Sequence, residues 1–213
     1  QGLHIIGITD HNSTQQCQLI WKLGKKAGLT VIPGCEVTTR EEVHCLALFP
    51  DFDALSEFQR FIDRRLMYIP NDPALFGYQV VVDENDNIEA EFQNYLGASV
   101  DSSIEEVEQM VHELSGIFIP AHVDRPRNSL FSQLGFIPFD LKVDALQISK
   151  LAEEQAVRQR YRIAPEISIV QFSDAHYLDG LGKIFTNFEM EKPTFSELKK
   201  ALISEDGRKV WIP

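Results

Sequence analysis

Short apolar runs alternate along the chain with longer stretches in which apolar residues recur at helical spacing. Helical spacing is clearest in residues 14–29, 51–66 and 103–114, and the third stretch opens with the capping-box pair Ser103 and Glu106. The apolar and β-branched runs predict strands, which cover residues 3–8, 30–32, 43–49, 117–119, 145–148 and 167–172. Repeated strand–helix units predict an α/β fold with a mainly parallel sheet, open or closed.

The alternation of strands and helices is interrupted between residues 67 and 102. This stretch contains Pro70, Pro73 and turn-prone Asn-Asp pairs, and it predicts a hairpin around residues 81–86. It has no low-complexity signature, so we expect an ordered insertion or small subdomain within one domain that spans residues 1–213. The remaining segments continue the alternation and comprise a helix at 152–161, a strand at 183–190, a helix at 194–202 and a strand at 209–212.

Four of the six histidines border these apolar runs, each beside a carboxylate or in a short polar motif: His11, His44, His122 and His176. Metal ions that activate water require imidazole nitrogens and carboxylate oxygens held at the ends of rigid strands. The pattern therefore favours a metal-dependent hydrolase. The other two histidines are not expected to bind metal. His4 fits a structural role, because it lies near the amino end of its strand, and His112 fits a surface role, because it lies off the apolar face of its helix.

Charge and cysteine content narrow the expected partners. The 32 acidic and 20 basic residues give a net charge of −12, which disfavours long nucleic acid but permits a small anionic substrate. Three cysteines without a CxxC pair predict free thiols in a reducing compartment, and we expect a cytoplasmic protein without a membrane-spanning segment. Cys35 and Cys45 adjoin Glu36 and His44, and their thiols should face the core because neighbours on a strand point to opposite faces.

The order of the polar motifs resembles that of the PHP domain, the polymerase and histidinol phosphatase superfamily. The matching segments contain Thr-Asp-His-Asn, Pro-Gly-Cys-Glu followed by Val-His-Cys, Pro-Ala-His-Val-Asp-Arg-Pro and Phe-Ser-Asp-Ala-His, and lie at residues 2–12, 33–46, 120–126 and 172–176. The resemblance implies a distorted (β/α)7 TIM-like barrel that holds up to three divalent metal ions, Zn, Mn or Fe. Members usually open with a strand carrying His-x-His. No segment here supplies that motif, so we expect a barrel without its first strand.

The resemblance also implies which residues bind each of the three metals. Glu36 would bridge two metals, and His44 and His122 would complete the second metal site. Asp174 would bind the first metal together with the two histidines of the absent motif. His11 and His176 would bind the third metal.

The activity implied by this resemblance is phosphoester hydrolysis by a metal-activated hydroxide. Asp174 or His176 would guide a proton or assist the leaving group. Arg125 would contact the phosphate, with a surface ion pair to Asp124 as the alternative. We expect a small phosphorylated metabolite or nucleotide as substrate. Three alternatives remain: a nuclease or phosphodiesterase acting on short oligonucleotides, a non-catalytic metal-binding module, and an amidohydrolase-like barrel.

Overall fold

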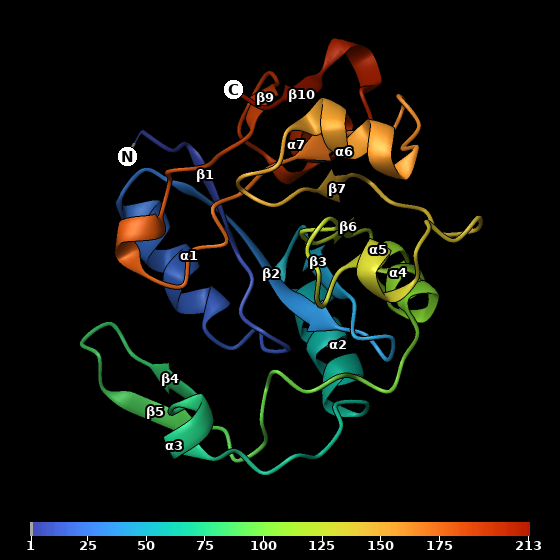
Figure 1. Cartoon of the computed structure of the whole chain (residues 1–213). Coiled ribbons are helices and arrows are strands. Elements are labelled where there is room, and N and C mark those ends of the chain that lie inside the picture. Colours follow the sequence, from blue (N-terminus) through green and yellow to red (C-terminus); the bar gives the residue numbers. More distant parts are fainter. Residues whose placement is uncertain (1) are drawn as a thin grey trace.

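The centre of the fold is a four-stranded sheet with the order β1-β2-β3-β6. The computed structural model describes residues 2–213, and Figure 1 shows the sheet surrounded by helices. The strands are β1 (Ile5–Ile8), β2 (Thr30–Thr38), β3 (His44–Leu48) and β6 (Ile117–Pro120). β1 and β2 are parallel, whereas β3 is antiparallel to both β2 and β6.

The prediction of a mainly parallel sheet is therefore wrong for this sheet. The physical reason is that β2 does not end at residue 32 but continues through Pro33 and Gly34 to Thr38. Only five residues then separate it from His44, the first residue of β3. So short a connection can join antiparallel strands only, because a parallel crossover requires a dozen residues or more.

Within residues 2–213, three two-stranded sheets accompany the central one. The parallel pair is β7 (Leu146–Gln147) with β8 (Ile169–Val170). The antiparallel pairs are β4 (Val80–Val82) with β5 (Ile88–Glu91) and β9 (Asn187–Glu189) with β10 (Lys209–Trp211). The fold is thus mixed α/β, and the hairpin predicted near residues 81–86 is confirmed.

Helices occur where the periodicity predicts them. The five longer ones are α1 (Cys17–Lys26), α2 (Phe52–Asp63), α4 (Ile104–Glu113), α6 (Glu154–Tyr161) and α7 (Phe195–Leu202). The predicted capping box of α4 is present. The sequence pattern missed two four-residue helices, α3 (Pro73–Phe76) and α5 (Leu130–Gln133), because one turn is too short to show a period. None of the helices in residues 2–213 combines the length and apolar character needed to cross a membrane.

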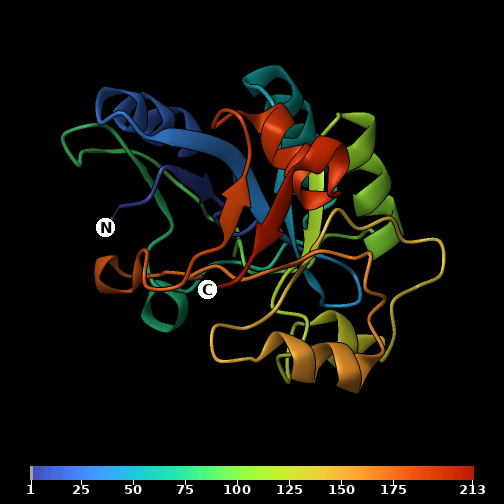
Figure 2. The same ribbon diagram turned by 90° about the horizontal axis from the view of Figure 1, so that it is seen from above.

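Alternation along the strands divides the core into two hydrophobic clusters. Cys35, Val37, Cys45 and Ala47 belong to one cluster, which includes buried residues of α2 and α4. Leu46 and its neighbours on the opposite face belong to the other, which includes α7. Figure 2 shows these helices distributed around the sheet. Because side chains alternate, Glu36 and His44 lie on the face opposite to the thiols.

The prediction that the thiols pack into the core is confirmed. Cys17, Cys35 and Cys45 are free and buried. Burial raises the pKa of the Cys17 thiol to about 11 and raises those of the other two well above their usual value. All three therefore remain protonated at neutral pH and act as apolar packing groups.

The assignment of His112 to the surface is wrong. The imidazole is only 26% exposed, and it lies between the buried carboxylates of Glu108 and Asp144. Nε2 is 2.9 Å from Asp144 Oδ2, an oxygen that also accepts a hydrogen bond from the Phe118 amide of β6. His112 thus ties α4 to the segment before β7, a contact between residues 32 apart in the chain.

This cluster predicts a pH-dependent contribution to stability. The hydrogen bond to Asp144, and further contributions from Glu108, raise the pKa of His112. A raised folded-state pKa stabilises the fold fully below the unfolded-state value near 6.5, and that contribution is lost as pH rises through the folded-state pKa. His112→Gln should therefore lower the free energy of unfolding by about 1–3 kcal/mol at pH 6 and by less at pH 9. Urea titrations measure the difference.

His4→Gln is the matched control, because His4 is exposed and precedes β1. It should give no pH-dependent difference from the unaltered protein. A His112→Gln deficit that is the same at pH 6 and pH 9 would contradict the prediction.

Candidate metal centre

Four predicted ligands meet at one edge of the central sheet. His11 follows β1, His122 follows β6, and Glu36 lies near the carboxyl end of β2. His44 begins β3, and because β3 runs in the opposite direction, its first residue lies at this same edge. The antiparallel strand therefore contributes a ligand from its amino end. In the parallel sheet that was predicted, only carboxyl ends would meet here.

Glu36 is the hub of this group. His44 Nδ1 lies 2.7 Å from Glu36 Oε1, and His122 Nε2 lies 3.3 Å from the same oxygen. His11 joins them: one donor atom each from His11, Glu36 and His44 lies within 4.8 Å of the others. The ring centroids of His11 and His122 are 5.1 and 5.2 Å from that of His44.

The environment favours the protonation states that bind metal. Burial alone would raise the pKa of Glu36. The hydrogen bonds of His122 and His44, together with the charges of His11 and His44, hold it well below its usual range. Burial lowers the pKa of His11, with the Glu36 charge acting in the opposite direction. An ionised carboxylate beside a neutral imidazole is the form in which both groups coordinate a cation.

Unpaired nitrogens give an independent test of whether these residues fit a metal ion. His11 Nδ1 and His122 Nδ1 are buried side-chain atoms without a hydrogen-bond partner in the described part of the chain. An unpaired buried nitrogen is costly, and a coordinated cation removes that cost. Imidazole nitrogens with a shared carboxylate form a donor set typical of divalent transition metals. His11, Glu36 and His44, with His122 beside Glu36, therefore fit a divalent metal centre.

Asp174 lies beyond this group and is held by Arg125. Arg125 Nη2 is 2.7 Å from Asp174 Oδ2. The alternative pairing with Asp124 is not formed, since Asp124 accepts hydrogen bonds from the backbone and hydroxyl of Ser149. The structure thus joins two residues that the sequence assigned to separate roles.

His176 is the most exposed of the predicted ligands. Its side chain is 65% exposed, and its Nδ1 lies 3.1 Å from the backbone carbonyl of Asp174. Its ring centroid is 6.4 Å from that of His11. His176 therefore stands at the outer rim of the centre, and its assignment as a ligand stays a prediction.

Three site residues adopt a left-handed backbone conformation that non-glycine residues rarely take. The φ angles are +46° at Asn12, +31° at His122 and +45° at Asp174. Such conformations persist only where surrounding contacts enforce them, and they concentrate at functional sites. The strain at these positions therefore agrees with a built site at this edge of the sheet.

Sequence reasoning missed the residue that anchors His11. Asn12 is fully buried, and its Nδ2 donates to the carbonyls of Leu96 and Ala98 at 2.7 and 2.8 Å. Its Oδ1 accepts from the Thr38 amide, and its own amide donates to the Glu36 carbonyl at 2.9 Å. Asn12 thus connects the last residues of the insertion to β2, the strand that contains Glu36. Asparagine tolerates a positive φ, which was the available signal.

Asn12→Gly should weaken metal binding, because glycine keeps the backbone conformation but removes all three side-chain hydrogen bonds. Misplacing a metal ligand through its support typically costs about 10–100-fold in affinity. Calorimetric titration with Mn²⁺ or Zn²⁺ measures this loss, and the absorption spectrum of the Co²⁺ form reports on ligand geometry.

Asn94→Gly is the matched control. Asn94 bonds the Ile69 amide and the Met67 carbonyl within the insertion and contacts no predicted ligand among the described hydrogen bonds. Its loss should leave the affinity and the Co²⁺ spectrum unchanged. Equal weakening by both variants would show that general loosening of the insertion, rather than Asn12, governs the site.

Comparison with known proteins places this geometry among established folds. No protein-family model matches the chain. The Bacillus subtilis protein YqxK, which is described as uncharacterized, is 22% identical over 191 residues, covering 85% of this chain and 43% of YqxK.

Solved structures are similar over almost the whole chain. The lesion-specific endonuclease Q of Pyrococcus furiosus superposes with a TM-score of 0.74 at 23% identity, covering 99% of this chain and 50% of the endonuclease. Endonuclease Q bound to a 27-mer duplex with an abasic lesion gives a TM-score of 0.68 at 23% identity, covering 98% of this chain and 50% of that one. The chain therefore spans about half the length of endonuclease Q.

The exclusion of long nucleic acid on the basis of net charge is wrong. A structure with the same fold was solved with a 27-mer DNA duplex. The physical reason is that net charge sums groups over the entire surface, whereas contacts with phosphates are made by local groups such as guanidinium ions or bound metals. A charge of −12 therefore does not exclude such a substrate.

A third solved structure connects the fold to the resemblance in the motifs. A two-domain protein of Bacteroides vulgatus, described as containing a predicted PHP-like metal-dependent phosphoesterase, superposes with a TM-score of 0.51 at 11% identity, covering all of this chain and 57% of that one. The chain has the fold shared by PHP-like metal-dependent phosphoesterases and endonuclease Q.

Proposed function

We propose that this chain carries the metal centre of a phosphoester hydrolase that cleaves phosphodiester bonds in DNA. The observation that carries the proposal is the cluster of His11, Glu36, His44 and His122, in which two buried imidazole nitrogens have no hydrogen-bond partner among the described residues. The likeness to endonuclease Q supports DNA over a small phosphorylated metabolite, because it is greater in TM-score than the likeness to the phosphoesterase of Bacteroides vulgatus.

The architecture we propose is a distorted (β/α)7 barrel, of which the separate sheets are sectors. Ligands that follow β1 and β6, Glu36 near the carboxyl end of β2 and Asp174 after β8 would then line one rim. The ions would be Zn²⁺, Mn²⁺ or Fe²⁺. When bound, they would lower the pKa of a coordinated water to about 7 and so supply hydroxide at neutral pH.

The protein residues would divide the remaining tasks. Glu36 would be shared between two ions, and His44 and His122 would complete the site around one of them. Asp174, His11 and His176 would serve the other positions. Asp174 or His176 would hold the proton that reaches the leaving oxygen. Arg125 would leave Asp174 and bind a non-bridging phosphate oxygen with its planar guanidinium.

Glu36→Gln tests the centre directly. The amide keeps the shape of the side chain but removes the charge shared by His44 and His122, so metal content and DNA cleavage should both fall, cleavage by at least about 100-fold. Metal analysis and cleavage of labelled duplexes with added Mn²⁺ or Zn²⁺ give the readouts. A parallel assay of phosphomonoesters distinguishes the small-substrate alternative.

Glu84→Gln is the control, because Glu84 is an exposed partner of Lys26 and lies outside the centre. It should retain full activity. Undiminished cleavage by Glu36→Gln, or the absence of metal-stimulated hydrolysis of any phosphoester by the unaltered full-length protein, would refute the proposed function.

Arg125→Gln should reduce kcat/KM for DNA by about 10–100-fold, because it removes a charge-assisted phosphate contact. Arg125→Lys should recover part of this loss, since it restores the charge without the two-pronged geometry. Arg127→Gln is the control, because Arg127 is exposed on the same loop. Steady-state kinetics in which Arg125→Gln and Arg127→Gln behave alike would exclude a specific role for Arg125.

A further inference from the structure

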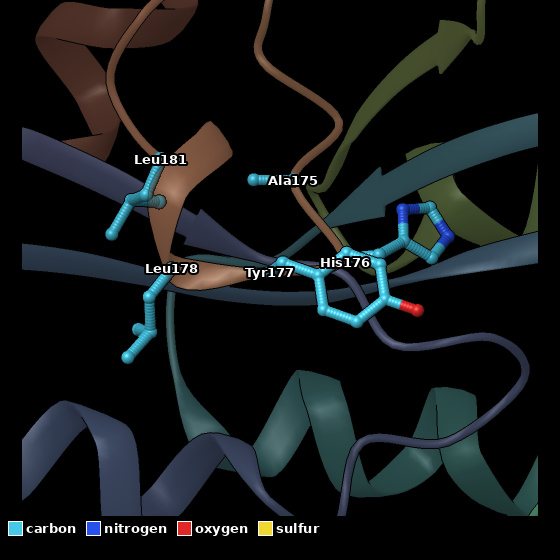
Figure 3. A pocket seen from close by; sticks show the side chains of 5 residues that line it. All are labelled: Ala175, His176, Tyr177, Leu178 and Leu181. Atoms are coloured by element: carbon cyan, nitrogen blue, oxygen red, sulfur yellow. The ribbon is translucent and has the colours of Figure 1, made fainter.

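An exposed apolar surface lies on the loop that follows Asp174. Tyr177 is 80% exposed and Leu178 is 88% exposed, and both line a shallow hollow of about 340 Å³. The hollow is completed by Ala175, His176 and Leu181. Figure 3 shows the rings of His176 and Tyr177 on one side of this hollow and the two leucines on the other.

The loop itself holds these side chains in position. The Gly180 amide donates to the Tyr177 carbonyl at 3.0 Å, and the Leu181 amide donates to the Leu178 carbonyl at 3.3 Å. These bonds form the one-turn helix η1 (Leu178–Gly180). Tyr177 has no aromatic ring packed against it among the described residues. The backbone is therefore internally bonded, while the apolar side chains face solvent.

The hollow borders the candidate metal centre through His176. His176 lines it, and the His176 ring is 6.4 Å from that of His11. Asp174, one residue before Ala175, is in contact with Arg125. A substrate whose phosphate lies between Arg125 and the metal ligands would therefore extend its neighbouring group towards Tyr177.

The chemistry of the lining indicates what that group is. Apart from the His176 imidazole and the Tyr177 hydroxyl, the lining side chains are apolar, so the hollow offers little to a second phosphate. An exposed tyrosine ring beside leucine suits a flat ring and its sugar. The volume lies at the lower end of the range for small-ligand pockets, about 300–1,000 Å³, which is compatible with a single nucleoside.

We propose that this hollow binds the nucleoside adjacent to the scissile phosphodiester, with the base stacked on Tyr177 and the sugar against Leu178. The proposal rests on the proposed function and extends it, because it names the residues that select a base-bearing neighbour. Tyr177 is a substrate-positioning residue here and takes no part in the bond-breaking step.

The test compares Tyr177→Ala and Tyr177→Phe in the full-length protein, with added Mn²⁺. Substrates are duplex oligonucleotides in which a single nucleoside, on either side of the cleaved bond in turn, is replaced by a tetrahydrofuran residue that lacks a base. Base stacking on an aromatic ring is worth a factor of about 5–150. Tyr177→Ala should raise KM by a factor in this range when both neighbouring bases are present, with little change in kcat.

The same variant should lose its defect on the one substrate that lacks the stacked base. Tyr177→Phe should behave like the unaltered protein, because it keeps the ring. The control is Tyr78→Ala, since Tyr78 is 74% exposed on the insertion and does not line the hollow. It should leave KM unchanged.

The outcomes distinguish failure of the nucleoside subsite from failure of the proposed function on which it rests. Normal hydrolysis with an unchanged KM in Tyr177→Ala overturns the nucleoside subsite alone. A KM defect that persists on every base-deleted substrate also overturns it, because the ring would then act through the loop and not through a base. Absence of metal-dependent hydrolysis in the unaltered protein overturns the proposed function, and this inference with it.

Discussion

The buried carboxylate of Glu36 is the constraint on which the arrangement of the central sheet depends. Removing a charged group from water is costly unless polar partners surround it. Here His44 and His122 supply those partners. His44 begins β3 and His122 follows β6, the two strands that come next in the order of the sheet. A different pairing of β3 would leave the carboxylate unpaired in the core. The chemistry of the centre and the topology of the sheet therefore support each other.

Much of the fold can be predicted from the local sequence pattern, and the errors in that prediction also have a local cause. The helices α1, α2, α4, α6 and α7 were predicted because each is long enough to show its period. β2 was predicted too short, because Pro33 and Gly34 interrupt its apolar run. That error hid the tight connection to His44 and led to the wrong strand direction. Strand pairing is a contact between distant segments, so the order and direction of the strands could not be derived from periodicity alone.

The candidate site was predictable to the extent that its residues border apolar runs. His11, His44 and His122 stand at such borders, and Glu36 lies within the strand that the pattern predicted only in part. Asn12 was missed because its partners lie 84 and 86 residues away in the insertion. His112 was misassigned because its second carboxylate, Asp144, is 32 residues distant and no helical pattern reveals it. Burial of a polar side chain depends on such distant partners.

Under the proposed function, the ion pair between Arg125 and Asp174 links metal binding to substrate binding. Arg125 Nη2 is 2.7 Å from Asp174 Oδ2, so a cation that takes this oxygen as a ligand competes with the guanidinium for it. The freed guanidinium then needs another anion, and a substrate phosphate supplies one at the same place. Conversely, a phosphate that binds Arg125 releases Asp174 for the cation. A bound cation frees the Arg125 guanidinium for the phosphate, and a bound phosphate frees the Asp174 carboxylate for the cation. Under the proposed function, metal and substrate therefore bind with positive coupling.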